Sequence, residues 1–233
     1  MANLLIIDTA TEACSVALTF NGNLYKQAEV APRMHGELVL PMVDEVLQEA
    51  GIKLKELDAI AYGQGPGAFT GLRICISIVQ GLAFGAGLPV VGVSSLQAMA
   101  QGLYMAKGEK QLLAVIDARM GEVYWGQYQE VDGLMQLVGE ETVCSPELVT
   151  ICDADASNVY QGVGTGWKTY ASELSEALNM PIVVQTEPLY PLAEYMMPMA
   201  EHLLKLGKAV PAEQALPIYL RDNVAKKAKE KQE

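Results

Sequence analysis

The sequence contains one unit twice: a buried strand that ends in aspartate, a short polar turn and a second strand. The first copy reads LLIID at residues 4–8, followed by the turn TATEAC and then SVALTF. The second copy reads LLAVID at residues 112–117, followed by ARMG and EVYWGQY. Short apolar runs bounded by turn residues are typical of strands. A chain built on this unit is expected to fold as two related halves that each begin with paired strands.

A glycine pattern follows each copy of the unit. The segments are YGQGPG at residues 62–67 and QGVGTG at residues 161–166, and each leads from a β-like run towards a helical segment. The shared order predicts a duplicated chain, in which each half runs strand, strand, strand, helix, strand, helix, strand, helix. Hairpins followed by βα units give mixed sheets flanked by helices, which is an α/β fold. Chance similarity of short Asp and Gly patterns is the alternative.

The glycine-rich stretch GQGPGAFTGLR leads into a helix expected over residues 72–87. This helix is apolar almost all round, and Ser77, Gly81 and Gly85 put a small residue at every fourth position. A membrane span is not expected, because the run is short and contains Arg73 and Gln80. Two readings stay open: contact with a second chain, or burial under the second half of the same chain.

Charge and residue counts exclude several classes of function. The chain has 233 residues and a formal net charge of -12, so a broad nucleic-acid-binding surface is not expected. Its four cysteines are not spaced like a zinc knuckle, which predicts free thiols in a reducing cytoplasm. The two histidines are His35 and His202. Two histidines are too few to favour a zinc site or a histidine-based catalytic triad.

The turn after the first strand resembles the first phosphate loop of actin-like ATPases and sugar kinases. Asp8, Thr9 and Thr11 stand where that loop addresses a metal-bound phosphate. In the second half, Arg119 and Glu122 stand where nucleotide-binding versions have paired glycines, so the loop is interpreted as vestigial. No tightly bound cofactor is expected, and nucleotide binding, if any, is expected to be weak. An aspartate that only forms the turn is equally compatible with this pattern.

Three segments together resemble one family. They are IDTATEACSVAL at residues 7–18, the long block at residues 63–100 and VIDARMGEVYW at residues 115–125. They are similar to the bacterial TsaB family, also called YeaZ, of the actin-like ATPase superfamily. The resemblance implies two ribonuclease-H-like lobes. We expect a first, dimerising lobe over residues 1–106, a reduced second lobe over 107–188, and a C-terminal helical segment over 189–233 that packs back across the lobes.

The resemblance also implies a function. Members of the family serve in making threonylcarbamoyl-adenosine in tRNAs that read ANN codons, and they are not thought to carry out the transfer. They pair with a catalytic TsaD-type subunit and with a TsaE-type ATPase, and they form homodimers alone; tRNA is contacted only through the complex. The catalytic relative carries a metal-binding His-x-x-x-His where this chain has Ser95 and Met99. Since neither side chain is a good hard-metal ligand, no metal is expected here.

The partner surface implied by the resemblance lies on the two helical segments near residues 34–50 and 69–86, and no role is expected at a membrane. The candidate interface residues are His35, Leu38, Val39, Met42, Phe69, Arg73, Ile76 and Gln80.

The resemblance thus implies a non-catalytic scaffold subunit that activates its catalytic partner, and two enzymatic hypotheses are the alternatives. The first is an ATP-binding phosphotransferase of the actin-like superfamily that acts through Asp8, because the first phosphate loop survives in the sequence. The second is a metallopeptidase, which the sequence disfavours because the ligands are missing.

Overall fold

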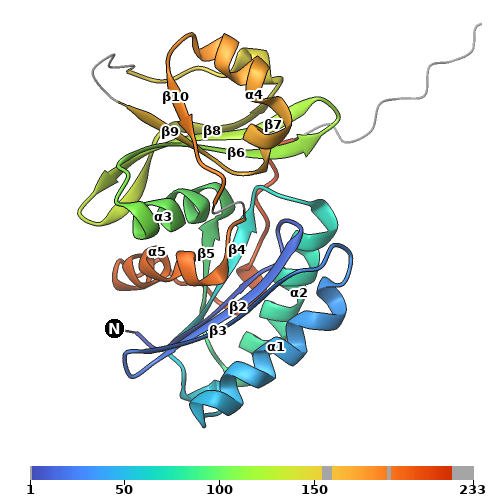
Figure 1. Cartoon of the computed structure of the whole chain (residues 1–233). Helices are drawn as coiled ribbons and strands as arrows, with labels where there is room; N and C mark the ends of the chain where they lie inside the picture. The colour runs from blue at the N-terminus through green and yellow to red at the C-terminus, as the bar shows by residue number, and fades with distance from the viewer. Residues whose placement is uncertain (1, 154–158, 188–189, 222–233) are drawn as a thin grey trace, which may run out of the picture.

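Two lobes stacked on one another make up the computed structural model, which describes residues 2–153, 159–187 and 190–221 (Figure 1). The elements of the first lobe are β1 (Leu4–Asp8), β2 (Ala13–Phe20), β3 (Asn23–Val30), α1 (His35–Ala50), β4 (Ala59–Gly65), α2 (Phe69–Ala86), β5 (Val90–Ser94) and α3 (Ser95–Lys107). The second lobe contains β6 (Gln111–Arg119), β7 (Glu122–Val131), β8 (Leu134–Cys144), β9 (Tyr160–Val163), α4 (Thr165–Leu178) and β10 (Ile182–Val184), and it is followed by α5 (Ala193–Lys205). Three short 3-10 turns are η1 (Leu54–Glu56), η2 (Pro146–Leu148) and η3 (Ala212–Gln214).

The two sheets have the same topology. The first has the order β3-β2-β1-β4-β5, and the second, read from its other edge, has β8-β7-β6-β9-β10. In each sheet the first three strands pair antiparallel and the next two pair parallel. The predicted fold class, α/β with two lobes of mixed sheet flanked by helices, is confirmed.

Helices and sheets alternate in layers (Figure 1). Helices α1 and α2 pack on one face of the first sheet, through residues such as Leu5 and Ile7 of β1. The alternate residues Leu4 and Ile6 face α3 and α5, because successive side chains of a strand point to opposite faces. Helix α3 also packs on the second sheet, whose far face is covered by α4. Helices α3 and α5 therefore form the layer between the sheets.

The second half departs from the predicted repeat at one place. Where the first half has α1, the described residues between β8 and β9 contain only the single turn η2. The expectation of a helix after the third strand of each half is therefore wrong for the second half. One outer face of the molecule carries two long helices, whereas the other carries α4 alone.

The glycine pattern serves close packing between elements. Gly65 and Gly164, at equivalent places, both have φ of +107°, which favours glycine. A Cβ atom on Gly67 would lie 2.4 Å from the carbonyl oxygen of Ala10, and one on Gly71 would lie 2.1 Å from that of Thr9. The β1–β2 turn therefore rests directly on the start of α2, with no room for a side chain between them.

Helix α2 is long and apolar enough to cross a membrane by length and composition alone. In this fold it packs on the first sheet through Leu72, Cys75 and Val79, which are fully buried. Its opposite side is exposed at Arg73, Ser77, Gly81 and Phe84. The helix is thus a core helix on one side and an open surface on the other.

The last described segment is the C-terminal strap (residues 211–221), which runs beside β4 and α2 to the second lobe (Figure 1). The backbone N–H of Ile218 donates to the carbonyl of Gln64, and the hydroxyl of Tyr62 bonds the backbone of Leu216. Helix α5 and the strap are the described parts of the C-terminal segment expected over 189–233. Residues 222–233, which hold the basic end of the chain, lie outside the described residues.

Candidate functional site

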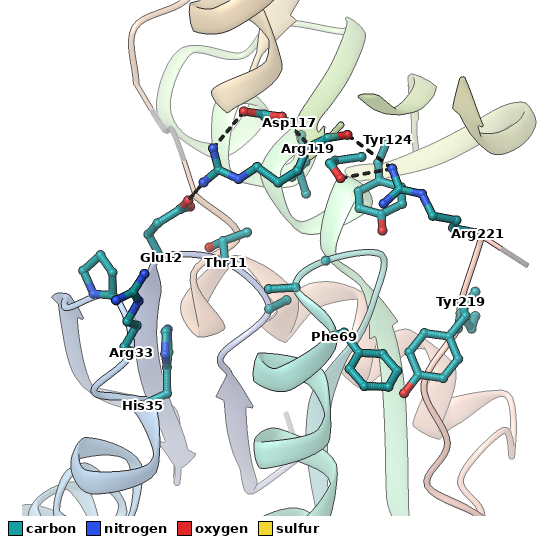
Figure 2. A pocket seen from close by; sticks show the side chains of 17 residues that line it. Thr11, Glu12, Arg33, His35, Phe69, Asp117, Arg119, Tyr124, Tyr219 and Arg221 are labelled. Carbon is teal, nitrogen blue, oxygen red and sulfur yellow. Dashed lines mark hydrogen bonds and ion pairs between the residues drawn. The ribbon is translucent and has the colours of Figure 1, made fainter. Parts of the chain in front are cut away.

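A cleft of about 590 Å³ lies between the two lobes, at the turns that end β1 and β6 (Figure 2). The start of α1, the start of α2 and the C-terminal strap complete its wall. Its charged and polar lining residues are Thr11, Glu12, Arg33, His35, Asp117, Arg119, Tyr124, Tyr219 and Arg221. Its apolar lining comes from Ala10, Pro32, Gly67, Ala68, Phe69, Ile116, Ala118 and Ile218. This is the place where the resemblance puts the phosphate loops.

Asp8 does not face this cleft. Its side chain is fully buried beneath the β1–β2 turn, and a Cβ atom on Gly63 would lie 1.8 Å from its Oδ2. Oδ1 accepts a hydrogen bond from the backbone N–H of Ala10, while Oδ2 has no partner among the described residues. Burial raises the pKa of Asp8 to about 7, and the Ala10 bond opposes that rise.

The burial of Asp8 bears on the phosphate-loop hypothesis. Thr9 is also buried, and its hydroxyl donates to the carbonyl of Gly71 on α2. Of the three predicted loop residues, only Thr11 lines the cleft. In this structure a carboxylate sealed from the cleft cannot reach a metal-bound phosphate there, so direct action through Asp8 is not supported.

An ion pair crosses the mouth of the cleft. The Arg119 guanidinium on the β6–β7 turn binds Glu12 of the first lobe at 2.7 Å and Asp117 at 3.0 Å (Figure 2). Arg119 and Met120 have φ of +63° and +60°, a region that is uncommon for residues other than glycine. Arg221 of the strap bonds the carbonyl of Ala118 and the carboxylate of Glu122, which fixes the same turn from the other side.

Three buried polar side-chain atoms in the cleft wall have no hydrogen-bond partner among the described residues. They are the hydroxyl of Thr11, Nε2 of His35 and Nε of Arg221, and Thr11 and His35 are only 7% exposed. Buried polar atoms are nearly always satisfied, so each such exception calls for an explanation. His35 is the first residue of α1 and is buried.

The positions of the absent metal ligands lie inside the packing between the lobes. Ser95 and Met99 are both fully buried on α3, and Met99 lies under Gly164 of the second lobe. In the described ranges, no group of three or more His, Cys, Asp and Glu side chains is placed to hold a metal ion.

The predicted interface residues separate into three groups. Val39, Met42 and Ile76 belong to the core beneath the helices and are at most 7% exposed, so they are removed from the candidate surface. Leu38 is partly buried, and His35 faces the cleft.

The remaining three candidates lie on α2, in contact with the strap. Phe69 is exposed, and the Arg73 guanidinium lies 3.8 Å from the centre of its ring. Arg73 also donates to the hydroxyl of Tyr219, whose ring lies 5.5 Å from that of Phe69. The side-chain amide of Gln80 donates to the carbonyl of Ala215.

Sequence reasoning missed the most exposed apolar residue of these helices. Phe84 is 82% exposed and lies on α2 with Arg73, Ser77 and Gly81 at a spacing of three to four residues. We call these four residues the α2 stripe. The sequence did contain a signal for it, because Phe84 is spaced three and seven residues from Gly81 and Ser77 and so lies on the same face of the helix.

Comparisons with known proteins agree with this architecture. A family model described as TsaD, tRNA N6-adenosine threonylcarbamoyltransferase, matches residues 24–229. The chain is 46% identical to the tRNA threonylcarbamoyladenosine biosynthesis protein TsaB of Escherichia coli K12, covering 95% of this chain and 96% of that protein. It is 40% identical to TsaB of Haemophilus influenzae, covering 95% and 94%. A solved structure of YeaZ from Pseudomonas aeruginosa superposes with a TM-score of 0.88 at 47% identity, covering 94% of this chain and all of that one.

Proposed function

The chain belongs to the TsaB (YeaZ) family of tRNA threonylcarbamoyladenosine biosynthesis proteins, and from this membership we propose that it is a non-catalytic subunit that pairs with a TsaD-type threonylcarbamoyltransferase. The observation that carries the proposal is the open side of α2, where an exposed phenylalanine, Phe84, lies beside small residues and is left uncovered by the described part of the chain. Exposed apolar surface of this kind is typical of protein–protein interaction sites.

The α2 stripe is suited to a close helix–helix contact. A Cβ atom on Gly81 or Gly85 would meet no atom within 4 Å, so the chain's own packing does not require glycine there. Small residues on an exposed helix let the backbone of a partner helix approach closely, and Phe84 supplies an anchor of the kind enriched at interface cores. We propose that the same surface forms a homodimer when the catalytic subunit is absent, and that the heterodimer then recruits a TsaE-type ATPase.

The site geometry favours a scaffold over a phosphotransferase. Asp8 is sealed beneath its turn, the Arg119–Glu12 pair crosses the cleft, and Ser95 and Met99 are packed in the interior. Tight nucleotide binding therefore has no support in the described residues, and tRNA is proposed to be contacted only through the complex. All four cysteines are free, which fits the proposed cytoplasmic location.

The pairing is tested by light scattering on a sizing column, with the chain alone and then mixed with a TsaD-type subunit. We expect a homodimer that converts into a one-to-one heterodimer. A chain that stays monomeric in both runs would overturn the proposal. Transfer activity measured with each subunit alone and with the mixture separates a helper from an enzyme, because a helper is inactive alone.

A further inference from the structure

We propose that the interlobe cleft binds a small amphipathic carboxylate, a monoanion with an apolar or aromatic body such as an N-acylated amino acid. The proposal goes beyond the pairing role and does not depend on it. It begins from Thr11 and His35, two residues of the cleft wall that are more than nine-tenths buried and have unpartnered polar atoms. Figure 2 shows both among the side chains that line the cleft.

Thr11 and His35 offer two unpartnered side-chain donors, which fit one carboxyl group, and Nε of Arg221 is a third. The Thr11 hydroxyl and a protonated Nε2 of His35 would supply one hydrogen bond to each carboxylate oxygen. Two backbone amides nearby are already used: the N–H of Ala10 donates to Asp8, and that of Ala68 donates to the carbonyl of Ala10. A phosphate chain is normally cradled by several free amides, and these two are not free.

The charge balance of the cleft favours a single negative charge. Arg33, Arg119 and Arg221 line it, and Arg119 is paired with Glu12 and Asp117 while Arg221 is paired with Glu122. Two of the three guanidinium groups are thus paired with carboxylates. Arg33 makes no ion pair with any described residue, and it stands beside His35 in the wall (Figure 2). It is the cation that remains for a ligand, and one unpaired guanidinium matches a monoanion better than a polyphosphate.

The rest of the wall suits an apolar body. Phe69, Tyr124 and Tyr219 line the side of the cleft that the C-terminal strap closes. Aromatic side chains with a few well-placed polar groups are typical of small-molecule sites, in which the polar groups fix the orientation of the ligand. A ligand that places its carboxylate at Thr11, His35 and Arg33 would extend its apolar body towards these rings.

The test uses the full chain alone and follows the ring signals of its two histidines by NMR, which a His202→Gln variant assigns. The probes are N-acetyl-L-phenylalanine, its uncharged amide, ADP and inorganic phosphate. We expect N-acetyl-L-phenylalanine to shift the His35 signal saturably and the amide to bind about tenfold more weakly or not at all. Thr11→Val and Arg33→Gln should each raise the dissociation constant about tenfold, whereas Lys55→Gln, which removes a charge outside the cleft, should not change it.

Three outcomes would overturn the proposal. The first is the absence of a saturable shift with the carboxylate. The second is equal binding of the amide, which would show that only the apolar wall is recognised. The third is tighter binding of ADP or phosphate than of the carboxylate. Melting curves of the variants show whether a loss of binding reflects a loss of folding, and failure here leaves the pairing experiment untouched.

Discussion

Ser94 of the first lobe donates its hydroxyl hydrogen to the carboxylate of Glu141 in the second lobe. Tyr128 donates to the same carboxylate, and Ser94 also accepts from the backbone N–H of Gln97 as the N-cap of α3. Burial raises the pKa of Glu141, and the two hydroxyl bonds oppose that rise. One serine thus caps a helix and joins the lobes.

Replacing Ser94 by alanine is expected to destabilise the chain by about 2–4 kcal/mol, because it removes a helix cap and leaves a largely buried carboxylate short of a donor. Denaturant unfolding measures this. Ser95→Ala is the matched control: the neighbouring hydroxyl is buried and has no partner among the described residues, so its removal should change stability by less than about 0.5 kcal/mol. Equal losses in both variants would contradict the lobe-joining role of Ser94.

Asp8 gives a pH-dependent contribution to stability. Its pKa is about 7 in the folded chain against 3.8 ordinarily, so between these values the unfolded chain ionises while the folded chain holds the proton. The contribution is fully present below pH 3.8 and is lost as the pH rises through about 7, with a total of about 4 kcal/mol. Asp8→Asn should flatten this slope and be more stable than the parent at pH 8, as shown by urea unfolding at several pH values. A variant with an unchanged slope would mean that Asp8 is ionised in the folded protein.

Two glycines of α2 are expected to respond in opposite directions to the same change. A Cβ atom on Gly71 would collide with the Thr9 carbonyl, so Gly71→Ala should cost about 3 kcal/mol or prevent folding. Gly81 has open space around it, so Gly81→Ala should stabilise the helix by about 0.5–1 kcal/mol. Thermal unfolding compares the two. A stable Gly71→Ala protein would show that the β1–β2 turn does not rest on α2.

Phe84→Glu is expected to leave the fold intact and to weaken pairing with a TsaD-type subunit at least about tenfold, because it places a charge at the centre of the proposed contact. Leu148→Glu makes the same change at a residue that is 69% exposed in the second lobe, and it should pair normally. Sedimentation or light scattering of the mixtures measures the difference. If both variants pair like the parent, the α2 stripe is not the contact.

The sequence predicted the first strands and the second helix of the first half closely. The apolar runs LLIID and SVALTF lie in β1 and β2, and the helix expected over 72–87 is α2, since apolar runs between turn residues indicate burial. The duplication was visible because each sheet repeats its aspartate and glycine pattern. The replacement of a helix by η2 was not, because the polar stretch after β8 carries no periodic pattern by which a helix could be expected or excluded.

The sequence did not predict which individual side chains are buried. Val39 and Met42 lie on a helix with a wide apolar surface, and only the packed structure shows which of its residues face the sheet. The burial of Asp8 depends on Gly63, a neighbour 55 positions away that leaves room for its carboxylate. The links from Glu141 and Arg221 to the opposite lobe likewise join residues that are distant in sequence and follow no local pattern.

The absence of a counterpart to α1 among the described residues of the second lobe bears on how far assembly can proceed. If both lobes had kept an outer layer of two helices, each molecule would present two equivalent faces, and copies could add at both ends without limit. With one such face, two subunits that join through it leave no second face of the same kind. Growth would then stop at a closed pair, and exchange of one partner for another would be the only way for a paired subunit to form a new contact there.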